Sequence, residues 1–103
     1  TVAWQKLTGH FLEMQAAHMR ELFAEDPDRF STFCLQEGPL LVDFSKNILT
    51  RETVALLIEL AHECQLPEAI ETQFRGGKIN ATEHRAVLHT ALRNRANTPV
   101  VVD

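Results

Sequence analysis

KINATEHRAVLHTALRNR, residues 78–95, is the stretch on which the interpretation of this chain rests. Its apolar residues between Val87 and Leu92 recur at helical spacing. A threonine followed by glutamate, Thr82 and Glu83, stands ahead of them as a helix start. The stretch therefore predicts a helix that begins near Thr82 and presents one apolar face.

Three cationic or titratable side chains follow a second spacing in the same stretch. Arg85, His89 and Arg93 lie four residues apart, so they would share one face of the predicted helix. Two guanidinium groups beside an imidazole could hold a sugar phosphate or a carboxylate of a neighbouring domain or subunit. We favour the interface, because arginine is common at such contacts.

The first part of the chain predicts a helix from Val2 to Arg20, although Gly9 costs such a helix about 1 kcal/mol relative to alanine. A second helical piece would carry Met19 to Phe23 and end before Pro27, which suits the first turn of a further short helix. The first helix has one stripe that we expect to be core: Trp4, Leu7, Phe11, Met14 and His18.

The middle of the chain predicts two more helices. Thr50 is a suitable N-cap, with Glu52 in the first turn, and the apolar arc behind it extends from Val54 to Cys64. Pro67 would start the next helix, which glycines at 76 and 77 would stop.

Two short apolar runs predict strands. Leu40 to Phe44, after Gly38-Pro39, is typical of a buried strand. Val100 to Val102 is typical of a second strand, which needs a neighbour and has only the first run to pair with. We therefore expect a mostly α-helical segment with two short strands, residues 1–103, without an internal domain boundary, as part of a longer chain.

Composition excludes several classes of function. The 103 residues carry a net charge of -4, which opposes nucleic acid or an anionic membrane as the main partner. No apolar run approaches the length of a membrane span, and we expect a cytoplasmic protein. In that compartment the two cysteines, Cys34 and Cys64, are more often free and buried than joined in a disulfide.

Other candidate sites favour ordinary structural roles. The sequence Gly76-Gly77-Lys78 lacks the remainder of a phosphate-binding loop, so we interpret it as a helix stop followed by a surface lysine. The spacing of the histidines does not place two ligands on one helix face, and we predict no metal site. The remaining polar groups are interpreted as helix ends, solvated faces and a local turn with an ion pair: Glu25-Asp26-Asp28, Glu68-Glu71 and Asp43-Lys46-Asn47.

The sequence of residues 78–95 resembles the amino-terminal region of the glucose-6-phosphate isomerase (phosphoglucose isomerase) family. Two further segments resemble that family in the same order, LVDFSKN at 41–47 and NTPVVVD at 97–103. Gly77 departs from the family pattern, which usually has glutamate there. The matching positions of the main segment are Lys78, Ile79, Asn80, Thr82, Glu83, Arg85, Ala86, Val87, Leu88, His89, Ala91, Leu92, Arg93, Asn94 and Arg95.

The resemblance implies a dimeric, cofactor-free enzyme that interconverts glucose 6-phosphate and fructose 6-phosphate through a cis-enediol. It implies a larger α/β body of three-layer sugar-isomerase domains, to which this segment contributes a helical arm. The family's catalytic residues are expected beyond residue 103, so no catalytic, substrate-binding or metal role is carried onto a position here. The implied partners are a sugar phosphate, the rest of the chain and a second subunit.

A second hypothesis comes from a different class. The stripes on the first helix and on the helix from Thr50 could bury a partner protein, which would make the chain a self-standing helical interaction module. Such a module would be folded and monodisperse by itself. An arm of a larger enzyme would instead expose apolar faces and be poorly stable alone.

Overall fold

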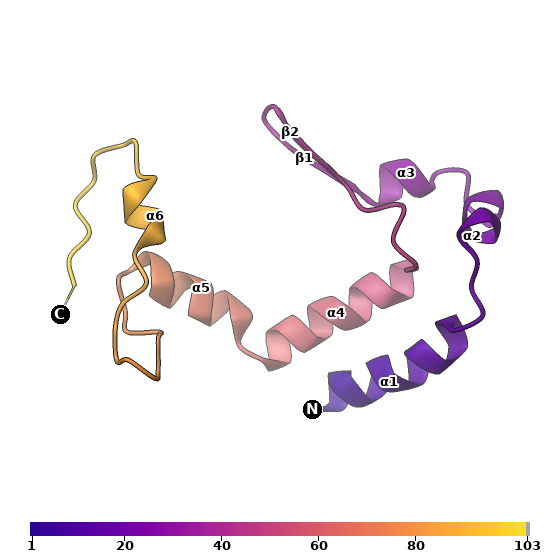
Figure 1. Ribbon diagram of the computed structural model, residues 1–103, viewed down its shortest axis with the longest axis horizontal. Helices are drawn as coiled ribbons and strands as arrows, with labels where there is room; N and C mark the ends of the chain where they lie inside the picture. Colours follow the sequence, from indigo (N-terminus) through magenta and orange to yellow (C-terminus); the bar gives the residue numbers. More distant parts are fainter. Residues whose placement is uncertain (103) are drawn as a thin grey trace. The chain divides into compact units, whose positions relative to one another are not determined.

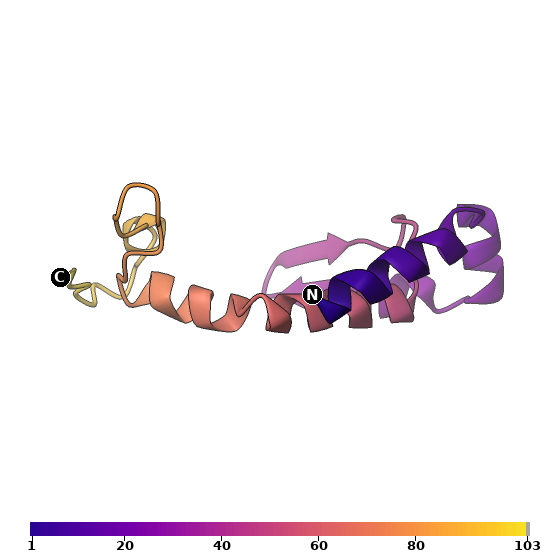
Figure 2. The same cartoon turned by 90° about the horizontal axis from the view of Figure 1, so that it is seen from below.

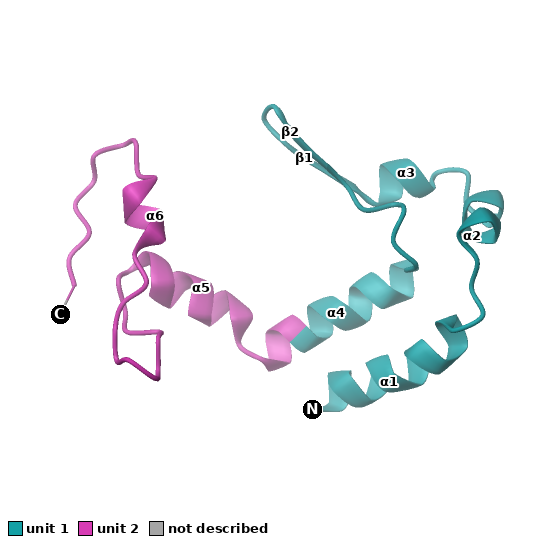
Figure 3. Ribbon diagram, viewed as in Figure 1, with its two compact units in different colours: residues 1–60 teal, residues 61–103 magenta. Residues whose placement is uncertain are grey.

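The computed structural model describes residues 1–102. They form two compact units, Thr1–Leu60 and Ala61–Asp103, each taken by itself below (Figure 3). Regular structure is mostly helical, with one two-stranded sheet (Figure 1). None of the helices in the described part of the chain is long and apolar enough to cross a membrane.

The predicted first helix ends earlier than expected. Helix α1 is Val2–Met14, so the prediction that it continues to Arg20 is wrong. Helix α2, Met19–Glu25, confirms the predicted second helical piece. His18 between them is extended, with φ -112° and ψ 135°. Phe23 of α2 lies against the guanidinium of Arg29. The predicted end of α2 before Pro27 is confirmed.

Helix α1 lies beside α4 (Arg51–Glu63) in antiparallel orientation (Figures 1 and 2). Lys6 forms an ion pair with Glu59, and one turn further along α1 His10 contacts Thr53. Ala3 and His10 are the buried residues of α1. Of the stripe predicted to be core, Trp4 and Phe11 face outward, 62% and 61% exposed, and His18 is exposed too, whereas Leu7 and Met14 are half-buried. That correction has a simple cause: the polar side of α1, not its apolar stripe, contacts α4.

A single arginine organises the centre of the first unit. Arg29, the first residue of α3 (Arg29–Thr32), is 2% exposed. Its guanidinium donates three hydrogen bonds to backbone carbonyls at 2.6–2.8 Å. The rings of Phe23 and Phe33 cover it at 5.5 and 4.8 Å from ring centroid to Cζ. The three carbonyls belong to the loop that leads into α4: Ser45, Asn47 and Leu49.

Two strands form an antiparallel hairpin. Strand β1 is Cys34–Glu37 and β2 is Leu40–Asp43, with Glu37 opposite Leu40 at the turn. Gly38 begins the two-residue turn with φ +55°, a conformation that glycine adopts at little cost. The strand predicted at 40–44 is therefore confirmed, but its predicted burial is wrong, because in the described residues no second layer covers either face.

The start of α4 agrees with the predicted cap. The Thr50 hydroxyl accepts from the backbone N–H of Thr53 at 3.3 Å, and the Thr53 hydroxyl accepts from the N–H of Thr50 at 2.9 Å. This is the reciprocal pattern of a capping box, with threonine in place of glutamate. Glu52 lies in the first turn as expected.

The second unit contains α5 (Leu66–Phe74) and the single turn α6 (His89–Leu92). Pro67 lies in the first turn of α5, as predicted. The helix predicted from Thr82 is wrong, because the side chain of Asn80 accepts from the Thr82 hydroxyl and the Glu83 N–H. Such local bonds compete with helix formation. A backbone bridge from Asn80 to Arg85 closes the resulting loop.

The predicted second strand at the end of the chain is not formed. Val100 to Val102 has no strand assignment, and the first apolar run pairs with β1 instead. The three valines lie against the backbone of Gly76, where the carbonyl of Val101 makes the closest approach. The two strands of the fold are therefore β1 and β2, within the described residues 1–102.

Replacing Arg29 with lysine should lower the free energy of unfolding by about 3 kcal/mol, because a lysine cannot bond to three separate carbonyls of this loop. Urea unfolding followed by circular dichroism measures this change. Arg51→Lys is the matched control, since that side chain is 69% exposed beside Asp26, and it should cost less than about 1 kcal/mol. Equal losses in the two variants would contradict the central role of Arg29.

Candidate functional site

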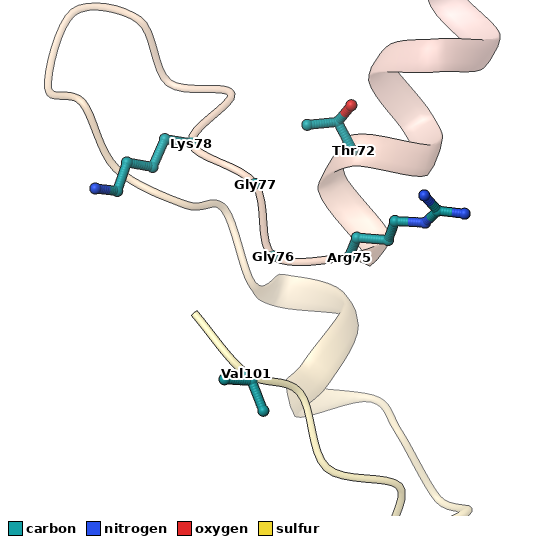
Figure 4. Close-up of a pocket in the computed structure, with 6 residues that line it drawn as sticks. All are labelled: Thr72, Arg75, Gly76, Gly77, Lys78 and Val101. Atoms are coloured by element: carbon teal, nitrogen blue, oxygen red, sulfur yellow. The ribbon is translucent and has the colours of Figure 1, made fainter. Parts of the chain in front are cut away.

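The end of α5 and the loop after it line a hollow of about 490 Å³ (Figure 4). Two cationic residues, Arg75 and Lys78, stand on its rim, and Val101 closes another side. Arg75 is paired with Glu71 one turn back, at 2.7 Å between Nε and Oε1. Lys78 is exposed. The remaining lining residues are Thr72, Gly76 and Gly77.

The backbone N–H groups that line this hollow already form hydrogen bonds at the end of α5. The N–H groups of Gly76 and Gly77 donate to the carbonyls of Gln73 and Thr72, and the N–H of Ile79 donates to Gly77. A phosphate cradle needs such groups turned toward the ligand. Gly76 has φ +81°, the left-handed conformation that ends many helices. The prediction of a helix stop followed by a surface lysine is confirmed.

The predicted cationic face is not assembled as a face. Arg85 closes the loop with Asn80, whereas His89 begins α6 and Arg93 follows its end. Arg85 and His89 do line one open, mostly apolar hollow of about 570 Å³, and Arg93 is outside it. Arg85 lies 3.8 Å from the carboxylate of Glu83. The prediction that Arg85, His89 and Arg93 share one helical face is wrong, because α6 does not include Arg85.

The turn after β2 fixes one carboxylate. Asp43 Oδ1 accepts from the hydroxyl of Ser45 at 2.6 Å and from its N–H at 2.9 Å. These bonds, the hydroxyl first, hold the pKa of Asp43 below its usual 3.8, and the nearby charge of Lys46 acts in the same direction. The predicted local turn is confirmed, but Asp43 is bonded to Ser45, and among the described residues it forms no ion pair within 4 Å with Lys46.

The other polar groups named from the sequence have structural neighbours. Asp26 accepts from the N–H of Asp28 at 3.1 Å and faces Arg51 at 3.6 Å. Cys34 and Cys64 are free, as predicted, but the prediction that they are buried is wrong, because Cys34 is half-buried and Cys64 is exposed. The short strand and the exposed end of α4 leave both without a second layer of structure.

Sequence reasoning missed one cluster in the first unit. His10 Nδ1 lies 3.7 Å from a carboxylate oxygen of Glu13 and 3.8 Å from one of Glu52. The three ligand atoms lie within 4.8 Å of one another, an arrangement that could hold a cation. The pair His10 and Glu13, three residues apart on one helix, was a local signal. Glu52 joins them only through the contact of α1 with α4.

Two glycine substitutions should act in opposite directions. Gly76→Ala should lower the free energy of unfolding by about 1–2 kcal/mol, the cost of a left-handed residue with a Cβ, and the new Cβ would meet the Val101 carbonyl at 3.0 Å. Gly9→Ala in α1, where a Cβ meets nothing within 4 Å, should raise it by about 0.5–1 kcal/mol. Urea unfolding measures the free energy of unfolding of both variants. An unchanged value for Gly76→Ala would show that the left-handed backbone at this position does not require glycine.

The turn at Asp43 should respond to acid in a defined direction. Its folded pKa is lowered, so the stability it contributes is present above pH 3.8 and is lost as pH falls through the lower folded value. Carboxyl carbon NMR should give a midpoint for Asp43 below 3.8. Ser45→Ala should move that midpoint back toward 3.8. An unchanged midpoint in the variant would show that another group is responsible.

Comparison with known proteins gives a consistent result. The family model described as phosphoglucose isomerase matches residues 43–103. Over 101 residues the chain is 55% identical to "Glucose-6-phosphate isomerase" of Methylococcus capsulatus, covering 98% of this chain. It is 54% and 52% identical to "Glucose-6-phosphate isomerase 1" of Neisseria meningitidis and Neisseria gonorrhoeae over the same length.

The chain spans about 18% of the length of each of these curated relatives. The family match covers more than half of the chain and includes the turn at Asp43, the loop at Asn80 and the segment from Arg85 to Arg93. The resemblance that three sequence segments indicated is therefore confirmed, and the chain belongs to the phosphoglucose isomerase family.

Proposed function

We propose that this chain is the amino-terminal part of a glucose-6-phosphate isomerase, which interconverts glucose 6-phosphate and fructose 6-phosphate. The observation that carries the proposal is the 55% identity over 101 residues to a protein of that name. The reaction moves a proton between C1 and C2 through a cis-enediol, and it belongs to glycolysis and gluconeogenesis. The enzyme works without a metal or organic cofactor.

The catalytic groups of this enzyme lie outside residues 1–103, and the segment alone is inactive. The geometry of the described residues supports this part of the proposal. Arg75 is paired with Glu71, and the backbone donors beside Lys78 are bonded within the helix end. Arg85 and His89 share an open hollow but have no arranged acid–base partner among the groups that line it, because Glu83 pairs with Arg85.

The role of the segment is to form a helical arm packed on the body of the enzyme. Trp4 and Phe11 present more than half of their surface, and Leu92 is 86% exposed. Among the described residues of the second unit, Gly76 alone is buried, so this unit has no core of its own. Apolar area of this kind is stabilised by burial, at about 25 cal/mol per Å². In this proposal the rest of the same enzyme chain buries these exposed apolar side chains.

The partners follow from the proposed activity. The full enzyme binds a sugar phosphate, acts in the cytoplasm and is a homodimer. Nucleic acid and membrane are not among its partners, in keeping with a net charge of -4. The second candidate, a self-standing interaction module, has one supporting feature, the outward-facing stripe of α1. An enzyme arm explains the same stripe and also the coreless second unit.

A coupled assay of fructose 6-phosphate conversion should separate the two candidates. The intact protein that carries this chain should be active, whereas residues 1–103 alone should show no turnover above buffer. The expected difference arises because the catalytic groups are supplied by the remainder of the protein. An inactive but folded intact protein would overturn the enzyme assignment, and an active segment would overturn the location of the catalytic groups.

Hydrogen exchange should reveal the covered surfaces. In the intact protein, amides of α1 and of residues 87–102 should exchange at least about tenfold more slowly than in the isolated segment, because packing raises the free energy of local opening. The loop held by Arg29 serves as the internal control, since its bonds lie within the first unit. Equal exchange in both samples would favour the self-standing module.

A further inference from the structure

The cluster on α1 and α4 contains a buried nitrogen without a partner. His10 is 7% exposed, and its Nδ1 is buried with no hydrogen-bond partner. The opposite ring nitrogen, Nε2, lies 2.6 Å from the Thr53 hydroxyl. A buried polar atom without a partner destabilises the folded state. The position therefore calls for something that can satisfy Nδ1.

The surroundings of Nδ1 specify the charge of the missing partner. Carboxylate oxygens of Glu13 and Glu52 lie 3.7 and 3.8 Å away, too far for direct hydrogen bonds. An imidazole lone pair that faces two carboxylates is unfavourable unless a positive charge lies between them. A cation held by all three groups would satisfy the nitrogen and neutralise both carboxylates.

The geometry points to a binding site for a divalent transition-metal ion of the zinc class, formed by His10 Nδ1 and by carboxylate oxygens of Glu13 and Glu52. Imidazole nitrogen with carboxylate oxygen is a ligand set that zinc accepts, whereas calcium and magnesium prefer oxygen alone. The three groups leave a fourth position for water. The role of the ion in this proposal is structural.

The three ligand atoms lie within 4.8 Å of one another, so movement of the two glutamate side chains would bring them to bonding distance of one ion. Bonds of about 2.0–2.1 Å in a tetrahedral site separate neighbouring ligand atoms by about 3.3 Å. The present separations from Nδ1, 3.7 and 3.8 Å, therefore need to close by about half an ångström. Glu13 and Glu52 can move, since their side chains are 74% and 68% exposed, and that exposure also admits the ion.

The second contact of the imidazole supports metal binding by the first. Metal-bound histidines usually donate their other N–H to an oxygen, which fixes the ring and its tautomer. Thr53 Oγ1 occupies that place at 2.6 Å, and it is itself held by the N–H of Thr50 at 2.9 Å. The ion would therefore join α1 to α4 directly beside the cap of α4.

Zinc binding to the intact protein that carries this chain tests the site. Equilibrium dialysis against zinc, with metal analysis, should find one more tight ion per chain in the wild type than in the double variant Glu13→Gln, Glu52→Gln. The affinity lost should be on the order of 100-fold, at least as large as the loss of outer partners. Both carboxylates are exposed, so this variant retains its fold.

The matched control removes the same charge elsewhere. Glu21→Gln with Glu25→Gln, both exposed on α2, should bind zinc as the wild type does. An anomalous diffraction peak between His10, Glu13 and Glu52 in zinc-soaked crystals would locate the ion independently of any change in activity. The site is refuted by equal zinc content in the three proteins, or by a map without that peak.

Discussion

The first unit depends on one buried cation. Arg29 is 2% exposed and donates to the carbonyls of Ser45, Asn47 and Leu49, while the rings of Phe23 and Phe33 cover it. A guanidinium presents several donors in one plane, so it can donate hydrogen bonds to three carbonyls that are not paired within a helix or strand. It holds the irregular loop between the hairpin and α4 in one conformation. Through that loop it also fixes where α4 begins.

That starting point determines what meets α1. The Thr50 and Thr53 pair caps α4 and also presents a hydroxyl to His10, so capping and helix contact share one group. Glu52, in the same turn, adds a carboxylate beside the imidazole. The polar side of α1 is thereby engaged with α4, and its apolar stripe at Trp4 and Phe11 faces outward. This orientation suits an arm that is covered by a larger protein body.

The second unit, unlike the first, has no buried centre among its described residues. Its residues include the segment that most clearly indicates the family, yet Gly76 is the single buried residue among those described there. Asn80 closes a loop by its own side chain where helical spacing predicted a helix. Local hydrogen bonds are favoured over the helix here, because no apolar helix face is stabilised by packing.

Sequence alone determined the features that short-range chemistry controls. These were the cap at Thr50, the proline start of α5, its stop at Gly76, the turn at Asp43 and, through motif wording, the family. Only the tertiary structure decided which faces are buried and that Arg29 and His10 are interior. The reason is physical: caps and turns are satisfied within a few residues, whereas burial depends on partners tens of residues away.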